Sequence, residues 1–200
     1  MTKSKSFLHL IPDKQLNFKS TTSRLWKEDV YDFFRDDNIN NSLEIGTNMG
    51  WTSFFLSHIS EQVYTIEINP KIMDVAKETC KEKTNIKYII GDAYSDNTYK
   101  NFPKYFDLVV IDCIHHYNQV ILDINRALSF MNPDKGIYIL FDDYSHPEAP
   151  EVKQAIDHSI NNGLKFEKHI GHNKGHTIIR SNNTQFTLTG PEGIILSYGI

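Results

Sequence analysis

Five apolar runs of β-strand character alternate with amphipathic segments through the middle of the chain. The runs occupy residues 41–46, 62–68, 86–92, 106–112 and 136–142. Apolar residues recur at helical spacing in segments 51–59, 70–83, 117–131 and 150–162. Because strands that alternate with helices form a parallel sheet covered on both sides, this pattern predicts a doubly wound α/β fold.

The two ends of the chain carry different patterns. The segment SRLWKEDVYDFF predicts an amphipathic helix, and residues 1–35 are expected to form an N-terminal cap, a helical extension or a dimer contact. Near the other end, LKFEKHI and HTIIR, joined by GHNKG, predict an antiparallel hairpin, which completes a mostly parallel sheet of seven strands. The last segment, 181–200, is expected to be a C-terminal β extension. Without a repeat or a low-complexity linker, residues 1–200 are expected to form one domain.

Composition narrows the partners that the protein is expected to have. The chain has 21 basic and 25 acidic residues, a net charge of −4, and its lysines are dispersed. It therefore lacks the basic face typical of proteins that bind nucleic acid. No apolar segment approaches the ~20 residues that span a bilayer, and the apolar stretch in the first residues is too short for a signal peptide. We therefore expect a cytoplasmic protein without membrane contact. Two cysteines, Cys80 and Cys113, are too few for a disulfide scaffold.

Acidic residues stand at the end of every predicted strand. In an open parallel sheet, ligands bind outside the carboxyl ends of the strands, so these positions are candidates for the chemistry. The residues are Glu44 with the nearby Gly46, then Glu67, Asp92, Asp112, and the pair Asp142 and Asp143.

The turn EIGTNMGW after the first strand suits a close approach of the backbone to a ligand. Gly46 and Gly50 permit a tight turn, and Asn48 is among the few other residues that tolerate positive φ. The spacing is not the GxGxxG of nicotinamide-dependent dehydrogenases, which disfavours that class. Glu67 has the position of the acid that binds ribose hydroxyls in nucleotide-binding βαβ units, and Asp92, in GDAY, is placed to reach an adenine amino group.

These segments resemble the class I S-adenosylmethionine-dependent methyltransferases. LEIGTNMGWTS is similar to their first motif, YTIEINP to the acidic ribose loop, GDA to the adenine loop and FDLVVID to the strand that ends beside the methyl donor. The resemblance covers roughly residues 25–180 and implies the Rossmann-like methyltransferase fold with S-adenosylmethionine as cofactor. The cofactor-binding residues that it implies are Glu44, Gly46, Asn48, Gly50, Glu67, Ile68, Asp92, Ala93 and Asp112.

A narrower resemblance rests on IDCIHHYNQVILDI followed by LFDDY. These segments are similar to the magnesium-dependent O-methyltransferases of small molecules, which carry D-x-x-H-x-Y and then a D-D pair. Carried over by position, Asp112, Asp142 and Asp143 would bind magnesium. His115 would be the general base, with Asp112 beside it as a catalytic residue, and His116 falls on a variable position. The acceptor would be a hydroxyl of a sugar, a natural product or a diol.

The charges of these residues support a metal site independently. Three carboxylates at two strand ends repel one another unless a cation neutralises them, and hard divalent cations prefer oxygen ligands. A bound cation lowers the pKa of an acceptor hydroxyl, and a neutral imidazole can then take the proton.

Several alternatives remain open from the sequence. Asp142 and Asp143 could cap a helix or lie in a loop, and Asp112 could contact only the donor's amino group. The enzyme would then be a metal-independent O- or N-methyltransferase, or the chain a catalytically silent module that binds the donor. The sequence does not identify the acceptor or decide whether the protein is a homo-oligomer.

Overall fold

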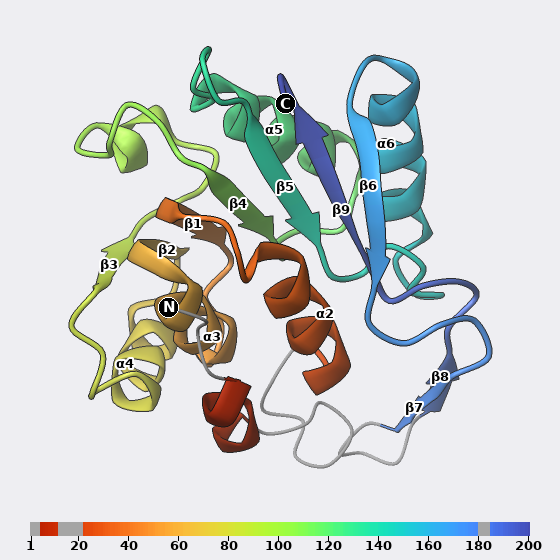
Figure 1. Cartoon of the computed structure of the whole chain (residues 1–200), viewed down its shortest axis with the longest axis horizontal. Helices are drawn as coiled ribbons and strands as arrows, with labels where there is room; N and C mark the ends of the chain where they lie inside the picture. Colours follow the sequence, from red (N-terminus) through yellow and green to blue (C-terminus); the bar gives the residue numbers. More distant parts are fainter. Residues whose placement is uncertain (1–4, 12–21, 180–184) are drawn as a thin grey trace.

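A seven-stranded sheet forms the centre of the protein in a computed structural model that describes residues 5–11, 22–179 and 185–200 (Figure 1). The strands are β1 Ile39–Ile45, β2 Ser60–Glu67, β3 Ile86–Ile90, β4 Leu108–Ile111, β5 Ile137–Phe141, β6 Lys165–Ile170 and β9 Gly193–Tyr198. Their order is β3-β2-β1-β4-β5-β9-β6, and the first five are parallel. The order reverses between β1 and β4, which is where ligands bind in such sheets.

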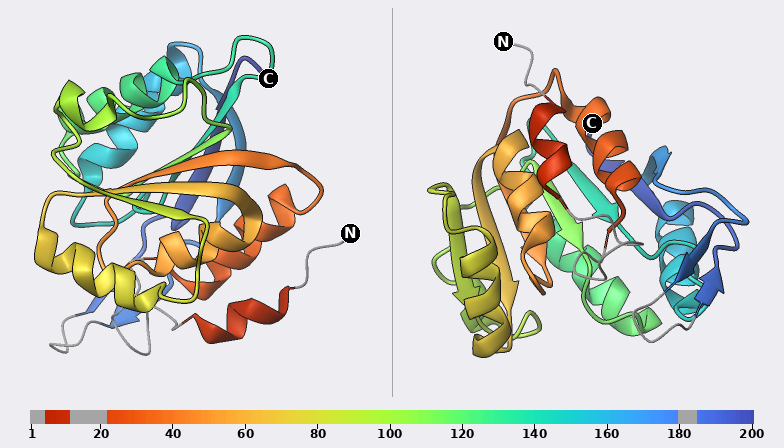
Figure 2. Two further views of the ribbon diagram at one scale, coloured as in Figure 1. Left: turned by 90° about the vertical axis from the view of Figure 1, so that its left-hand side faces the viewer. Right: turned by 90° about the horizontal axis from the view of Figure 1, so that it is seen from below.

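Helices cover both faces of the sheet (Figure 2). They are α2 Arg24–Phe34, α3 Trp51–Ile59, α4 Pro70–Thr79, α5 Tyr117–Ser129 and α6 Pro150–Asn161, with short 3-10 helices η1 Lys5–Leu10 and η2 Asp96–Tyr99. One buried cluster joins the sheet to α2 and α3, and the other joins it to α5 and α6. Successive β4 residues alternate between the clusters, since Leu108 and Val110 belong to the first and Val109 and Ile111 to the second. The doubly wound α/β fold is therefore confirmed.

The C-terminal strands are antiparallel, as expected, but the predicted pairing is wrong. LKFEKHI forms β6, which pairs with β9, and HTIIR contributes β7 (Thr177–Ile179), which pairs with β8 (Gln185–Thr187) in a separate two-stranded sheet. The apolar β9 pairs with both β5 and β6, and its first five residues are buried. The more polar β6 is left at the sheet edge, where exposed and charged side chains are tolerated.

The start of α2 is tied to the last part of the chain. Trp26, Val30 and Phe34 bury the apolar face that the sequence predicts, and Ser23 caps the helix. The carboxylate of Glu192, which is 2% exposed, accepts the Ser23 amide at 2.9 Å, the Ser23 hydroxyl at 2.6 Å and the His172 amide at 2.9 Å. This buried network joins the described parts of segments 1–35 and 181–200 to each other.

Among residues 5–11, 22–179 and 185–200, no helix has the length and apolar character needed to cross a membrane.

Candidate active site

The turn between β1 and α3 adopts the backbone conformations that its sequence predicts. Gly46, Asn48 and Gly50 all have positive φ, at 100°, 46° and 82°. A Cβ atom at Gly46 would lie 1.9 Å from the carbonyl oxygen of Asp112, so only glycine fits there. The Gly46 and Thr47 amides donate to the Ile66 carbonyl at 3.2 and 3.1 Å. The turn is thus fastened to β2 at the carboxyl edge of the sheet.

Glu67 ends β2 directly beside this turn. Its carboxylate accepts the Asn48 amide at 3.2 Å and the Asn69 amide at 2.9 Å. The side chain is half-buried, whereas its neighbour Ile68 is 66% exposed. Glu67 therefore orients the glycine turn, and its partly exposed carboxylate can still accept hydrogen bonds from a ligand.

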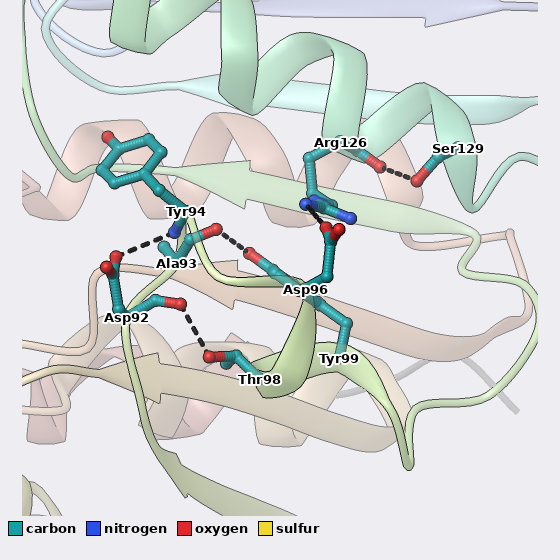
Figure 3. Close-up of polar contacts among 8 residues, drawn as sticks. All are labelled: Asp92, Ala93, Tyr94, Asp96, Thr98, Tyr99, Arg126 and Ser129. Atoms are coloured by element: carbon teal, nitrogen blue, oxygen red, sulfur yellow. Dashed lines mark hydrogen bonds and ion pairs between the residues drawn. The ribbon is translucent and has the colours of Figure 1, made fainter.

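The loop after β3 lies next along the same edge (Figure 3). It begins where the Gly91 amide donates to the Glu67 carbonyl at 3.0 Å. The Asp92 carboxylate is exposed and accepts the Tyr94 amide at 2.9 Å, while Ala93 is 9% exposed. Glycine turn, Glu67 and Asp92 thus follow one another along three neighbouring strands, which is the arrangement expected for a bound nucleoside.

Glu44 lies below the edge and not on it. Leu43 and Ile45 face the α5 and α6 side, so Glu44 points to the opposite side, where its 1% exposed carboxyl accepts the hydroxyls of Thr65, at 2.5 Å, and Ser53. Thr65 in turn bonds the hydroxyl of Thr47 in the glycine turn. Glu44 is enclosed by these protein groups, which fits a residue that supports the turn from below and does not fit direct contact with the cofactor.

Burial of Glu44 gives the first prediction, which concerns stability. Burial raises the pKa of this carboxyl to about 8, although the two hydroxyls and the charge of Lys27 lower it. The folded protein therefore binds the proton more tightly than the unfolded chain does. This contribution to stability is complete below pH 4.5 and is lost as pH rises through about 8. The free energy of unfolding should fall on the order of a few kcal/mol over that range, and less steeply in Glu44→Gln.

Urea unfolding at pH 5, 6.5 and 8 measures this slope. Glu61→Gln, which alters an exposed carboxylate of β2, is the matched control and should keep the parent's slope. Equal slopes in Glu44→Gln and the parent would show that Glu44 is not the titrating group.

Lys27 is a buried charge that sequence reasoning missed. Its side chain is 0% exposed, and its ammonium group donates to the Thr22 carbonyl at 2.9 Å and to the Thr22 hydroxyl. The helical pattern of α2 does not predict this burial, because an exposed residue directly after Trp26 is equally compatible with an amphipathic helix.

Three of the predicted residues come together beyond the glycine turn. His115 Nε2 lies 3.2 Å from Asp143 Oδ2 and 3.7 Å from Asp112 Oδ1. One ligand atom of each residue lies within 4.8 Å of the other two. The carboxylates are mostly enclosed, with 11% and 14% of the side chains exposed, whereas the imidazole is 41% exposed. The buried Nε2 atom of the imidazole faces the two carboxylates, so the exposed part of the ring is the part that a ligand can reach.

Asp142 does not belong to this cluster. Its side chain is 1% exposed, and the group of ligand atoms includes Asp112, His115 and Asp143 only. Asp142 lies in a bend directly after β5, and of the two adjacent carboxylates only that of Asp143 reaches the cluster. Of the predicted metal set, the structure thus brings Asp112 and Asp143 together, beside the predicted base His115, whereas metal binding by Asp142 stays a prediction.

His116 points away from the cluster. Its Nδ1 lies 3.7 Å from Glu151 of α6, and the same carboxylate accepts the Tyr117 amide at 2.7 Å. Glu151 thus stabilises the first turn of α5, a role that the sequence did not suggest. Of the two histidines, the structure places His115 in the cluster and His116 outside it.

Asp112 and Asp143 fit a divalent cation. They supply hard oxygen ligands from neighbouring strands, and two mostly enclosed carboxylates close together need a positive charge between them. Magnesium keeps several water ligands when only one or two carboxylates bind it, so two suffice. In the described part of the chain, no other group of histidine, cysteine, aspartate and glutamate residues meets the same spacing.

Residues 43–144 match the model of a methyltransferase domain family. The chain belongs to this family. The match extends from β1 to the residue after Asp143, so it includes all of the predicted site residues. For this methyltransferase domain, the predicted fold family and the predicted family membership are both confirmed.

Individual methyltransferases are similar to the chain over different lengths. A fibrillarin-like rRNA/tRNA 2′-O-methyltransferase of Methanococcus vannielii is 33% identical over 94 residues, 46% of this chain and 40% of that protein. This chain spans 40 to 63% of the length of that protein and two further curated relatives.

Two solved structures resemble the domain over nearly its whole length. An O-methyltransferase from Bacillus cereus in complex with SAH has a TM-score of 0.66 at 17% identity, over 97% of this chain and 90% of that one. TomG, an O-methyltransferase from Streptomyces achromogenes in complex with SAM, has the same score and identity over 99% and 91%. At such identities these likenesses establish the Rossmann-like methyltransferase fold.

Proposed function

We propose that this protein transfers the methyl group of S-adenosylmethionine to a hydroxyl of a small molecule, assisted by a divalent cation such as magnesium. The observation that carries the proposal is the order of groups along one sheet edge. The glycine turn, Glu67 and Asp92 lie on one side, and the cluster of Asp112, His115 and Asp143 follows directly on the next strands. A nucleoside-type site thus borders a base held by carboxylates.

The donor side supplies hydrogen-bond acceptors and close backbone approach. Glu67 would accept the ribose hydroxyls, because its carboxylate stays partly exposed while two amides fix its orientation. Asp92 would accept the adenine amino group, with Ala93 and Ile68 beside the base. Gly46, Asn48 and Gly50 would admit the methionine part close to the main chain. Bound S-adenosylmethionine supplies an electrophilic methyl group on a sulfonium.

The acceptor side supplies a base and a place for the cation. Asp112 and Asp143 would hold the cation, which lowers the pKa of a hydroxyl near it. His115, 3.2 Å from Asp143, would take the proton from the acceptor hydroxyl, and the adjacent carboxylate would stabilise the resulting imidazolium. Two oxygens on neighbouring carbons could replace two waters of the cation, which favours a diol as acceptor.

A ribose hydroxyl of RNA is the second candidate acceptor. It is favoured by the 33% identity to a protein described as an rRNA/tRNA 2′-O-methyltransferase. The net charge of −4 argues against a polyanion, because RNA binding depends on neutralising phosphates with basic side chains. A small, uncharged acceptor remains the better fit.

Calorimetric titration tests the proposal. S-adenosylhomocysteine, the product of the donor, is titrated into the protein with and without magnesium, and magnesium alone is titrated into the parent and Asp112→Asn. We expect binding of S-adenosylhomocysteine and a magnesium heat that the variant lacks. Formation of S-adenosylhomocysteine from the donor is then followed with catechol and with a short RNA, and we expect turnover with catechol only.

Each alternative gives a different result. Turnover without a magnesium requirement indicates the metal-independent enzyme, and turnover on RNA alone indicates the second candidate. Donor binding without turnover on either acceptor is the behaviour of a silent module. Absence of donor binding would overturn the proposed function itself.

A further inference from the structure

Asp123 is a buried carboxyl outside the strand-end cluster. It lies on α5, is 1% exposed, and faces the Tyr94 hydroxyl, whose oxygen is 3.4 Å from Asp123 Oδ2. The Cys113 thiol approaches the same two groups from the loop after β4. Burying a carboxyl is unfavourable unless polar partners compensate, and Tyr94 belongs to the predicted adenine loop. The contact therefore connects α5 to the donor side of the site.

The loop that carries Tyr94 is closed by its own hydrogen bonds (Figure 3). The Tyr94 amide donates to the Asp92 carboxylate at 2.9 Å, and the Thr98 hydroxyl donates to the Asp92 carbonyl at 2.6 Å. The Tyr99 hydroxyl donates to the Ala93 carbonyl at 2.8 Å. The loop is thus a closed unit, and a shift of one part moves Asp92 with it.

A second side chain of α5 holds the outer end of this unit. Arg126 donates to Asp96 at 2.5 Å, and its guanidinium lies over the Tyr99 ring, 4.5 Å from the ring centre. Residues 123 and 126 are three apart and so lie on the same face of the helix. The helix therefore contacts the loop at an inner point, through Tyr94, and at an outer point, through Asp96 and Tyr99.

We propose that Asp123 is a positioning residue for the methyl donor: through Tyr94 it holds the loop of Asp92 and Ala93, and so sets the affinity for the nucleoside half of the donor. The proposal rests on the proposed function for the identity of its ligand. It adds a residue that the sequence did not suggest.

The electrostatics of Asp123 give this role a measurable signature. Burial raises the pKa of the Asp123 carboxyl to about 7, against the lowering effects of the Tyr94 hydroxyl and of Arg126. The groups that face it are Tyr94 and Tyr99 from the loop side, Cys113 from the loop after β4, and Arg126 from its own helix. Above pH 7 the ionised carboxylate accepts a stronger bond from Tyr94 than the neutral acid does below it.

The test is titration of the full chain with S-adenosylhomocysteine at pH 6, 7 and 8. We expect the parent to bind ~5-fold more tightly at pH 8 than at pH 6, which is the gain of a charged over a neutral hydrogen-bond acceptor. Asp123→Asn keeps the shape but never ionises, so its affinity should be independent of pH and ~5-fold weaker than the parent's at pH 8. Tyr94→Phe removes the other partner and should also give a flat profile.

Ser129→Ala is the matched control, because it alters only a hydroxyl that bonds the Arg126 carbonyl of the same helix. It should keep the parent's pH profile, and thermal unfolding at each pH verifies that all variants are folded. A pH profile that persists in Asp123→Asn, or a flat one in the parent, would overturn the proposal. If the parent does not bind S-adenosylhomocysteine at any pH, the proposed function fails instead.

Discussion

The Asp143→Asn variant should lose ~100-fold or more in methyl transfer, a loss typical of removing a charged group from a catalytic constellation. Its binding of S-adenosylhomocysteine should stay within about twofold of the parent's, since Asp143 follows β5, whereas the glycine turn, Glu67 and Asp92 follow β1, β2 and β3. Asparagine preserves the shape of the side chain but removes its charge. The variant therefore loses one ligand for the cation and the partner that lies 3.2 Å from His115 Nε2. Release of S-adenosylhomocysteine with catechol and magnesium measures the rate.

Asp142→Asn is the informative comparison, because it changes the adjacent carboxylate in the same way. Asp142 lies outside the cluster of ligand atoms, so its variant should retain the magnesium heat that Asp143→Asn loses. Thermal unfolding must accompany this measurement, since a substitution at a side chain only 1% exposed can destabilise the fold. Loss of magnesium binding in a folded Asp142→Asn would instead support the ligand set predicted from the sequence, which includes Asp142.

The difference between these two carboxylates shows what the sequence could and could not predict. The run that ends in Asp142 and Asp143 predicts a buried strand and places both acids at its carboxyl end, where the structure has them. The direction of each side chain depends on how the chain leaves the sheet, which is not encoded in the run itself. For His115 and His116 the motif register favoured the correct residue for the cluster.

Long-range pairing is the other limit. Each of the five parallel strands is predicted by an apolar run within its own segment, and all of them lie where the pattern predicts. Segments LKFEKHI and HTIIR are close in sequence and read as a hairpin, yet β6 pairs with β9, which begins more than twenty residues later. The apolar residues of β9 are buried better between two strands than at the sheet edge, and neither local propensity nor turn residues predict that pairing.

The Glu67→Ala variant should bind S-adenosylhomocysteine ~30-fold or more weakly, while its magnesium heat stays that of the parent. Loss of hydrogen bonds to a carboxylate typically costs about 1.5–3 kcal/mol, which corresponds to roughly 10- to 150-fold in affinity. Two effects combine, because the substitution removes the acceptor for the ribose hydroxyls and releases the Asn48 amide that Glu67 fixes in the glycine turn. Calorimetry with each ligand separately measures both affinities.

Glu67→Gln separates these two effects. The amide keeps one oxygen, so it can accept either the Asn48 or the Asn69 amide, but its NH₂ group faces the other donor. If Glu67 acts mainly by orienting the glycine turn, Glu67→Gln should recover part of the affinity for S-adenosylhomocysteine that Glu67→Ala loses. If its charge recognises the ribose, the two variants should lose affinity equally. Glu78→Gln, on the exposed face of α4, controls for the change in net charge. Unchanged binding of S-adenosylhomocysteine by Glu67→Ala would show that Glu67 does not bind the ribose. The reason to place the nucleoside over the end of β2 would then be lost.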